Sequence, residues 1–313
     1  NAFVSPVRTG DTNAFSFFGS LEYDVTEKLT LAGGARFTDE DRDFEVEREV
    51  GPFGSGTFGP VTGSVGDEQI SWDVSANYAV SDDLNAYARI AKGFRGPSIQ
   101  GRLVFGNTVS DADSETVLSY EAGVKSELLD NRVRVNANVF LYELEDQQLT
   151  IVGGLDNTVA LFNADEGQGY GFEVDLEAAP VENLLLTAGL SYNNTEIKDD
   201  LLIAPGCGAP CTILDPAVFD VNGTTVEVAP GGTAPAGGTL LGYNISGNSF
   251  PNAPEWIANF TARYAIPFRS GEFFAYTDWA YKGETNFFLY DSVEFGEDGY
   301  WIGGLRAGWQ GDN

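Results

Sequence analysis

The chain has 313 residues, enough for one large all-β domain or two smaller ones, and its 38 Gly, 22 Phe and 13 Tyr, with no Met or His, favour strands over helices. With 47 acidic against 17 basic residues, the net charge of -30 excludes a nucleic-acid partner, because nothing here could neutralise a run of phosphates. There is no charged-then-apolar leader and no run of 18 apolar residues, so we expect neither a signal peptide nor a membrane helix. A membrane protein of this composition would therefore be a β-barrel.

Alternating apolar and polar residues predict eleven strands. In chain order they cover residues 13–25, 29–48, 69–80, 84–95, 115–128, 132–149, 167–178, 184–198, 255–266, 273–288 and 300–310. Short polar turns, such as "SDD" and "LDNR", alternate with long connections. We expect these long connections at 49–68, 96–114, 150–166, 199–254 and 289–299. This asymmetry is typical of outer-membrane barrels, whereas a kelch-type propeller with a period of about 50 residues needs four strands per repeat.

The strand at 84–95 illustrates the two faces that the alternation predicts. The positions expected to face lipid are Leu84, Ala86, Ala88, Ile90 and Phe94. Those expected to face a polar lumen are Asn85, Tyr87, Arg89, Gly93 and Arg95. At roughly 3.3 Å per residue and a tilt of roughly 45°, such a strand rises about 28 Å, enough for the hydrocarbon core. Lys92 would extend its ammonium to lipid headgroups, and Gly96 and Pro97 would end the strand at the outer rim.

Aromatic residues gather near the ends of the predicted strands, as they do in the two interfacial girdles of a membrane barrel. They include Phe15, Phe17, Phe18, Trp72, Phe94, Trp256, Phe273, Phe287, Phe288, Tyr300, Trp301 and Trp309. A soluble sandwich shows the same alternation with its apolar faces turned inward, and these rings would then be core residues. The strand lengths and the unequal loops favour the barrel.

Three stretches resemble the C-terminal part of the barrel of TonB-dependent receptors. "LNAYARIAKGFRGPS" resembles a tyrosine-rich strand that ends in a Gly-Phe-Arg-x-Pro motif, "ETVLSYEAGVKSELLDNRVRVNANVFLYELEDQQ" resembles the hairpin that follows it, and "SFPNAPEW" resembles a later loop-to-strand junction. The resemblance runs from about residue 13 to 310. It implies a plugged barrel of about 22 strands in the outer membrane of a Gram-negative bacterium.

The resemblance also implies a function and partners. Such receptors take up scarce nutrients, commonly a ferric siderophore, cobalamin or a glycan, with energy passed from the inner-membrane TonB complex. The expected partners are therefore outer-membrane lipid and lipopolysaccharide, TonB acting through a plug, and a small-molecule ligand. A passive porin or a structural surface β-protein is the alternative, and the substrate is not readable from the residues.

The sequence departs from that family in what it lacks. We find no plug domain, no TonB-contacting segment and no terminal strand after "GWQGDN". Eleven strands are an odd number, whereas an intact bacterial barrel has an even number. Residues 1–313 are therefore expected to be an incomplete segment of a larger barrel domain.

Charged residues at the predicted lumen positions are candidate contacts to a plug or a passing ligand. They are Arg36, Arg89, Arg95, Glu121, Lys125, Arg134, Glu173, Asp175 and Glu177. The alternative is that they only hydrate the barrel wall.

Acidic clusters elsewhere give weaker indications. "TDEDRDFEVERE" at 38–49 carries seven carboxylates that could bind divalent cations bridging lipopolysaccharide, or could be a solvated strand extension. "DADSE" at 111–115 lacks the glycine and distal Glu of a calcium loop. Without His there is no base for a catalytic constellation, so we expect no enzyme, no cofactor and no metal site.

The segment 199–254 is expected to be a long extracellular loop without strands. Cys207 and Cys211 fit a loop disulfide or half of a metal site, and the absence of His favours the disulfide. Phe219, Tyr243 and Phe250 could form an uncharged aromatic lid over the lumen, which suits a neutral or cationic ligand. The alternative is a mobile loop that only shields the mouth.

Overall fold

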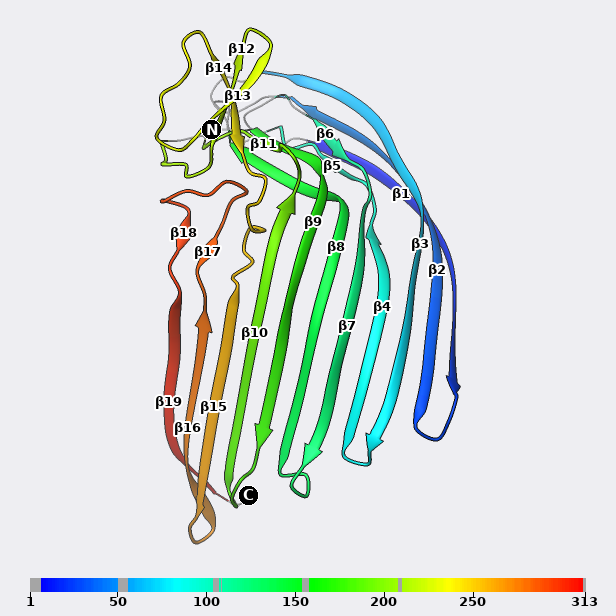
Figure 1. Cartoon of the computed structure of the whole chain (residues 1–313), viewed down its shortest axis with the longest axis vertical. Helices are drawn as coiled ribbons and strands as arrows, with labels where there is room; N and C mark the ends of the chain where they lie inside the picture. Colours follow the sequence, from blue (N-terminus) through cyan, green and yellow to red (C-terminus); the bar gives the residue numbers. More distant parts are fainter. Residues whose placement is uncertain are drawn as a thin grey trace.

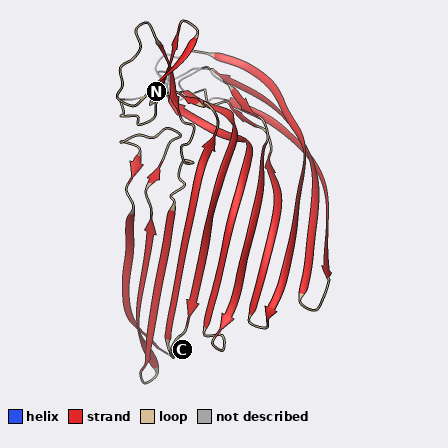
Figure 2. Ribbon diagram, viewed as in Figure 1, coloured by secondary structure: helices blue, strands red, loops and turns tan. Residues whose placement is uncertain are grey.

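The computed structural model describes residues 7–49, 56–103, 107, 109–153, 158–207 and 210–311. It consists mainly of one sheet of 11 antiparallel strands that lie side by side in chain order (Figure 1, Figure 2). From edge to edge these are β1 Val7–Asp24, β2 Leu29–Arg48, β3 Phe58–Ser81, β4 Leu84–Arg95, β7 Glu115–Leu128, β8 Val133–Gly153, β9 Thr158–Ala178, β10 Leu184–Lys198, β15 Trp256–Pro267, β16 Gly271–Lys282 and β19 Tyr300–Gly311. Among the described residues, no helix is long and apolar enough to cross a membrane.

The all-β fold and the eleven predicted strands are confirmed, and β1 and β19 form the two edges of an open, curved wall. The short turns lie at one end of this wall and the long connections at the other (Figure 1). We call these the turn end and the loop end.

Several predicted boundaries are wrong, beginning with the first strand, which starts at Val7 and not at residue 13. The expected connections at 49–68 and 150–166 consist largely of strand, because β3 begins at Phe58 and the β8–β9 hairpin stays paired up to Gly153 and Thr158. A strand can continue through glycines where an aromatic ring of the neighbouring strand packs over them. The Phe44 ring does so at Gly63, since a Cβ there would lie 2.5 Å from the ring. The predicted strand at 273–288 ends earlier, at Lys282.

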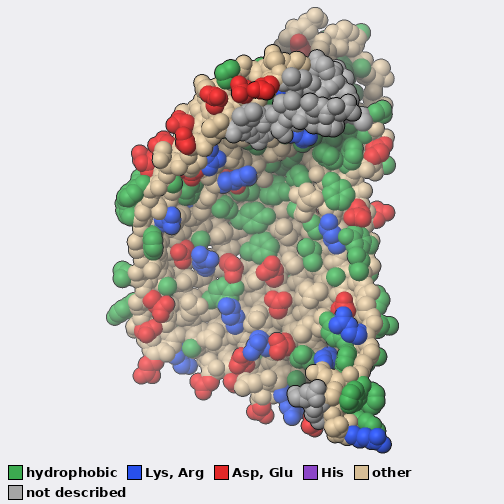
Figure 3. All heavy atoms as spheres, turned by 180° about the vertical axis from the view of Figure 1, so that it is seen from behind, with side chains coloured by type: hydrophobic (Ala, Val, Ile, Leu, Met, Phe, Trp, Pro, Cys, Tyr) green, Lys and Arg blue, Asp and Glu red, His purple; other side chains and the backbone are tan. Residues whose placement is uncertain are grey.

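The strand register separates polar from apolar side chains over the whole wall. Arg89 is paired with Glu121, Lys125 with Asn136, and Asn138 with Glu173, so all the predicted lumen residues lie on one face. Figure 3 shows acidic and basic side chains spread over this hollowed face. The opposite face carries exposed apolar side chains, among them Phe17, Leu21, Val74, Ile90, Val139, Phe260, Trp279, Trp301 and Leu305.

The loop end contains a small unit with its own core. Its sheet comprises β11 Ile203–Ala204, β12 Ala217–Val221, β13 Thr224–Val228 and β14 Thr239–Asn244, so the expectation that 199–254 has no strand is wrong. The turn between β12 and β13 is Asn222-Gly223, with φ of 55° and 81°, a hairpin signal that the composition of the loop obscured. The core joins Leu149, Ala164, Ile197, Ala204, Ile245, Leu289 and Tyr290, all buried.

Two short hairpins complete the loop end. β5 Ser98–Gln100 pairs with β6 Ser110–Ala112 in the connection that follows β4. β17 Thr285–Asn286 pairs with β18 Gly296–Glu297 in the connection between β16 and β19. Both hairpins lie toward the loop end in Figure 1.

Candidate functional site

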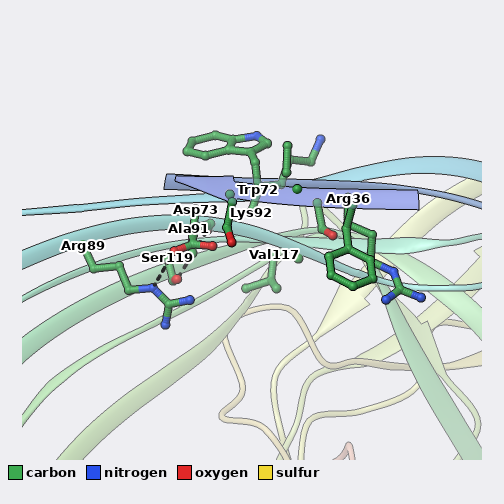
Figure 4. A pocket seen from close by; sticks show the side chains of 15 residues that line it. Arg36, Trp72, Asp73, Arg89, Ala91, Lys92, Val117 and Ser119 are labelled. Atoms are coloured by element: carbon green, nitrogen blue, oxygen red, sulfur yellow. Dashed lines mark hydrogen bonds and ion pairs between the residues drawn. The ribbon is translucent and has the colours of Figure 1, made fainter. Parts of the chain in front are cut away.

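The polar face of β1, β2, β3, β4 and β7 holds a hollow of about 500 Å³ between two guanidinium groups, those of Arg36 and Arg89 (Figure 4). Its polar-face lining includes Ser20, Gly34, Ser71, Asp73, Ala91, Gly93, Val117 and Ser119. Arg36 Nη2 donates to Ser16 Oγ at 2.6 Å and its Nε donates to Thr38 Oγ1 at 3.2 Å, while the guanidinium lies 5.8 Å from the Phe18 ring centroid. This geometry holds the Arg36 cation in place through hydroxyl groups, with no carboxylate of the described residues as its partner.

The middle of the same face brings several predicted residues together. Tyr87 donates its hydroxyl hydrogen to the Glu121 carboxylate, and Lys125 Nζ lies 5.4 Å from the Tyr87 ring centroid. Tyr87 lies flat over its cross-strand partner Gly123, where a Cβ would be 2.7 Å from the ring. The glycine therefore makes room for the ring that positions Glu121.

The remaining predicted charges lie on the same face in different surroundings. Arg134 is 3.1 Å from Glu127 and 3.7 Å from Glu177. Glu173 Oε2 accepts a hydrogen bond of 3.1 Å from Asn138 Nδ2. Asp175 and Arg95 share the face through their register, but within the described ranges neither forms an ion pair.

Gln148, which no sequence pattern indicated, holds both ends of the connection between β4 and β7. Its Nε2 donates to the carbonyl oxygens of Gly96 and Asp113, both at 2.8 Å, and its side chain is buried. Arg48, also buried, donates to the Leu103 carbonyl at 2.8 Å inside the same connection. These partners are 35 to 55 residues apart in sequence, so no local pattern could have revealed them.

The loop segments at 199–254 and 283–299 are fastened together at Asp215. Asp215 Oδ1 accepts from Asn248 Nδ2 at 3.0 Å, and Oδ2 accepts from the Asp291 backbone N–H at 2.8 Å. Burial raises the pKa of Asp215 from 3.8 to about 6, and the neighbouring Asp291 charge adds to the rise, although both hydrogen bonds oppose it. Thr212 donates its N–H and hydroxyl to Glu294 at 2.8 and 3.0 Å. We call this group of contacts the loop clasp.

The three residues suggested as a lid do not form one cluster. Phe219 lies in β12 and Tyr243 in β14 of the small sheet, whereas Phe250 packs against the core of the loop unit and donates its N–H to Thr195 Oγ1 at 3.0 Å. Cys207 and Cys211 are joined by a disulfide, with a Cα–Cα distance of 6.2 Å, and Cys207 packs against the same core.

The acidic segment 38–49 lies on the loop-end half of β2. On the polar face Glu40 pairs with Arg42 at 2.6 Å, while the register places Asp39, Asp41 and Asp43 on the opposite face. The 111–115 segment is held by Asn163 and Gln148, which bind Asp113. Within the residues that the structure describes, no group of three or more acidic, Cys or His residues is arranged to hold a metal ion.

Residues 1–313 match the family described as TonB dependent receptor-like, beta-barrel. The pesticin receptor of Yersinia enterocolitica is 26% identical over 171 residues, which cover 53% of this chain and 24% of that receptor. The ferric-pyoverdine M114 receptor PbuA of Pseudomonas sp. (strain M114) is 26% identical over 123 residues, covering 39% of this chain and 14% of that receptor.

A solved structure has the same wall. The ferric yersiniabactin uptake receptor FyuA from Yersinia pestis superposes with a TM-score of 0.71 at 19% identity, covering 98% of this chain and 40% of that chain. The chain thus spans well under half the length of these relatives. By its family match over the whole sequence, and by the wall that it shares with FyuA, the chain belongs to the β-barrel family of TonB-dependent receptors.

Proposed function

We propose that this chain forms part of the wall of a receptor that takes up a ferric siderophore with energy supplied through TonB. Members of its family lie in the outer membrane of Gram-negative bacteria. The main support is a single arrangement: a wall with an apolar outer face and a charged inner face, covered at the loop end by a unit with its own core. Such a wall separates lipid from a hydrated path, and the loop unit offers a place for selecting a ligand.

The substrate class is supported by the names of the similar proteins. Two of them are called receptors for ferric chelates, ferric pyoverdine and ferric yersiniabactin. Cobalamin and glycans remain the other substrates to test. On this proposal Phe219 and Tyr243 in the small sheet contact the ligand, and Phe250 anchors the sheet to the wall.

The same proposal implies three partners, which are membrane lipid, lipopolysaccharide and TonB. On this proposal the apolar outer face contacts membrane lipid. Asp39, Asp41 and Asp43 share that face of β2 in its loop-end half, and their carboxylates would contact lipopolysaccharide. TonB acts on the complete receptor through a plug inside the wall.

The test is uptake by the complete receptor in a strain that lacks its own siderophore receptors. Radioactive iron supplied as a ferric siderophore should accumulate only when TonB is present, and labelled cobalamin and a labelled glycan should not. Uptake of iron, cobalamin and glycan alike without TonB would instead identify a passive porin.

A further inference from the structure

The apolar face of the wall holds a hollow of about 490 Å³ near its turn end, over β10, β15, β16 and β19. The side chains that line it from this face include four small ones, Ala262, Ala275, Thr277 and Ala307. The register pairs Ala262 with Thr277 and Ala275 with Ala307, so these side chains lie side by side across three strands. The four strands beneath the hollow are paired without a gap, so small side chains create it. We call this hollow the notch.

Aromatic rings close the notch at both of its ends along the strands. On β16, Trp279 follows the small residues and Phe273 precedes them, and Trp309 of β19 pairs with Phe273. The Trp279 indole lies over Gly303, where a Cβ would collide with the ring. Its Nε1 donates to Thr277 Oγ1 at 2.8 Å. The indole N–H therefore needs no water, which suits a ring surrounded by hydrocarbon.

A positive charge lies at the turn end of the same strands. Arg269 is in the turn between β15 and β16, and its guanidinium carbon is 5.0 Å from the Phe268 ring centroid. The Phe268 ring centroid lies 5.6 Å from that of Phe273, at the end of the notch. Glu272 of the same hairpin pairs with Arg263 on the polar face, and within the described residues Arg269 forms no ion pair. A chain of two rings thus connects the notch with an available cation.

The spacing between this cation and the notch matches the depth of one membrane leaflet. Ala275 follows Arg269 by six residues, which is about 20 Å along the strand at roughly 3.3 Å per residue, or about 14 Å in depth at a tilt of roughly 45°. The hydrocarbon of one leaflet is about 15 Å thick. A lipid with its phosphate at Arg269 would therefore have its acyl chains at the level of the notch.

We propose that the notch binds an acyl chain of one phospholipid of the periplasmic leaflet and that Arg269 binds the phosphate of this lipid. The short turns of outer-membrane barrels face the periplasm, so the turn end lies at this leaflet. The apolar lining removes the acyl chain from looser neighbours, and a guanidinium donates paired hydrogen bonds to phosphate oxygens. The notch is on the outer side of the wall, away from the lumen, and is continuous with the face that contacts lipid. The proposal rests on the proposed function for its membrane location alone.

The experiment uses the complete receptor, purified in a mild detergent, and measures bound lipid by native mass spectrometry. Palmitoyl-oleoyl phosphatidylglycerol is the added probe, and we expect one molecule to stay bound where further lipids dissociate. Ala275→Leu fills the notch and should weaken this binding at least tenfold, because the acyl chain can no longer enter. Ala88→Leu is the matched control, since it adds the same side chain to the apolar face of β4, outside the notch, and should leave the binding unchanged.

The phosphate contact is tested with a second pair of variants. Arg269→Gln should weaken the binding roughly fivefold, the effect expected of one basic residue at an anionic lipid surface. Arg132→Gln removes a cation from the turn between β7 and β8, several strands away, and should have no effect. Palmitoyl-oleoyl glycerol, which lacks the phosphate, should bind the wild type more weakly than the phospholipid does and should bind Arg269→Gln equally well.

Equal phospholipid binding by the wild type, Ala275→Leu and Arg269→Gln would overturn the proposal. Lipopolysaccharide bound in place of the phospholipid, and displaced by Ala275→Leu, would also overturn it. A receptor dimer that disappears in Ala275→Leu would show that a second copy of the receptor occupies the notch instead. The binding is measured without TonB and without an iron chelate, so a failure of the proposed uptake would leave this result unaffected.

Discussion

The Asp291 backbone N–H donates to Asp215 Oδ2 at 2.8 Å, which joins two connections that lie 76 residues apart in sequence. Asn248 reinforces this junction because its Nδ2 donates both to Asp215 and to the Leu289 carbonyl, each at 3.0 Å. One carboxylate thus fastens three segments at the loop end. The two loops contain no Lys or Arg, so no cation offsets the charges of Asp215 and Asp291.

The first prediction is that the loop clasp weakens as the pH rises. The pKa of Asp215 is about 6 in the clasp and about 3.8 once the loops open, so the clasp binds the proton more tightly. The resulting stability is fully present below the lower pKa and is lost as pH rises through about 6. The difference between the two pKa values corresponds to about 3 kcal/mol, which solvent screening reduces to roughly 2 kcal/mol. Hydrogen exchange of the Leu214 and Val293 amides, corrected for its intrinsic pH dependence, should show this loss between pH 4 and 7.

Asp215→Ala provides the control for the clasp. It should speed exchange at both amides at least tenfold, because it removes the acceptor for Asn248 and for the Asp291 N–H. It should also reduce the excess pH dependence to the part that comes from Asp291, whose pKa burial raises as well. Asp200→Ala changes an exposed acid of the same connection and should leave the exchange unaltered. An undiminished pH effect in Asp215→Ala would show that Asp215 is not the group that titrates.

The second prediction concerns the two faces of β8. Val139 lies on the apolar face well inside β8, and Asn138 beside it lies on the polar face, paired with Gly123 and Glu173. Val139→Arg should cost about 2 to 4 kcal/mol of stability, because it places a charge in the hydrocarbon, whereas Asn138→Arg should be mild. Urea unfolding of the complete receptor in lipid vesicles measures both, and equal costs would contradict the assignment of the faces.

The third prediction concerns the glycine beneath Tyr87. A Cβ at Gly123 would lie 2.6 Å from the Ala137 carbonyl oxygen and 2.7 Å from the Tyr87 ring, so Gly123→Ala must displace one of them. We expect a loss of about 1 to 3 kcal/mol, together with loss of the hydrogen bond from Tyr87 to Glu121.

Gly19→Ala is the matched control in β1, since a Cβ there meets nothing within 4 Å. It should change the free energy of unfolding by no more than about 0.5 kcal/mol in the same urea experiment. A comparable loss in both variants would mean that the ring contact does not constrain the glycine.

Much of the wall was predictable because strand periodicity is a local property. Alternation in Val133–Leu141 and in Phe172–Glu177 fixes which side chains share a face before any pairing is known. The strand ends were less predictable, since the paired residues 58–68 contain glycines that composition assigns to a loop. Asn222-Gly223 is a typical hairpin turn, but it lies in a segment whose proline and glycine content predicted a loop without strands.

The sequence by itself determined the all-β class, the eleven strands and the division into a charged and an apolar face, because each depends on neighbours two residues apart. Only the tertiary structure decided which charges meet. It gave Arg36 hydroxyl partners, paired Arg134 with Glu127 and Glu177, and brought Asp215 to Asp291 across 76 residues. Such contacts depend on strand register and loop packing, which are set by the summed pairing and burial of many distant residues and leave no local pattern in the chain.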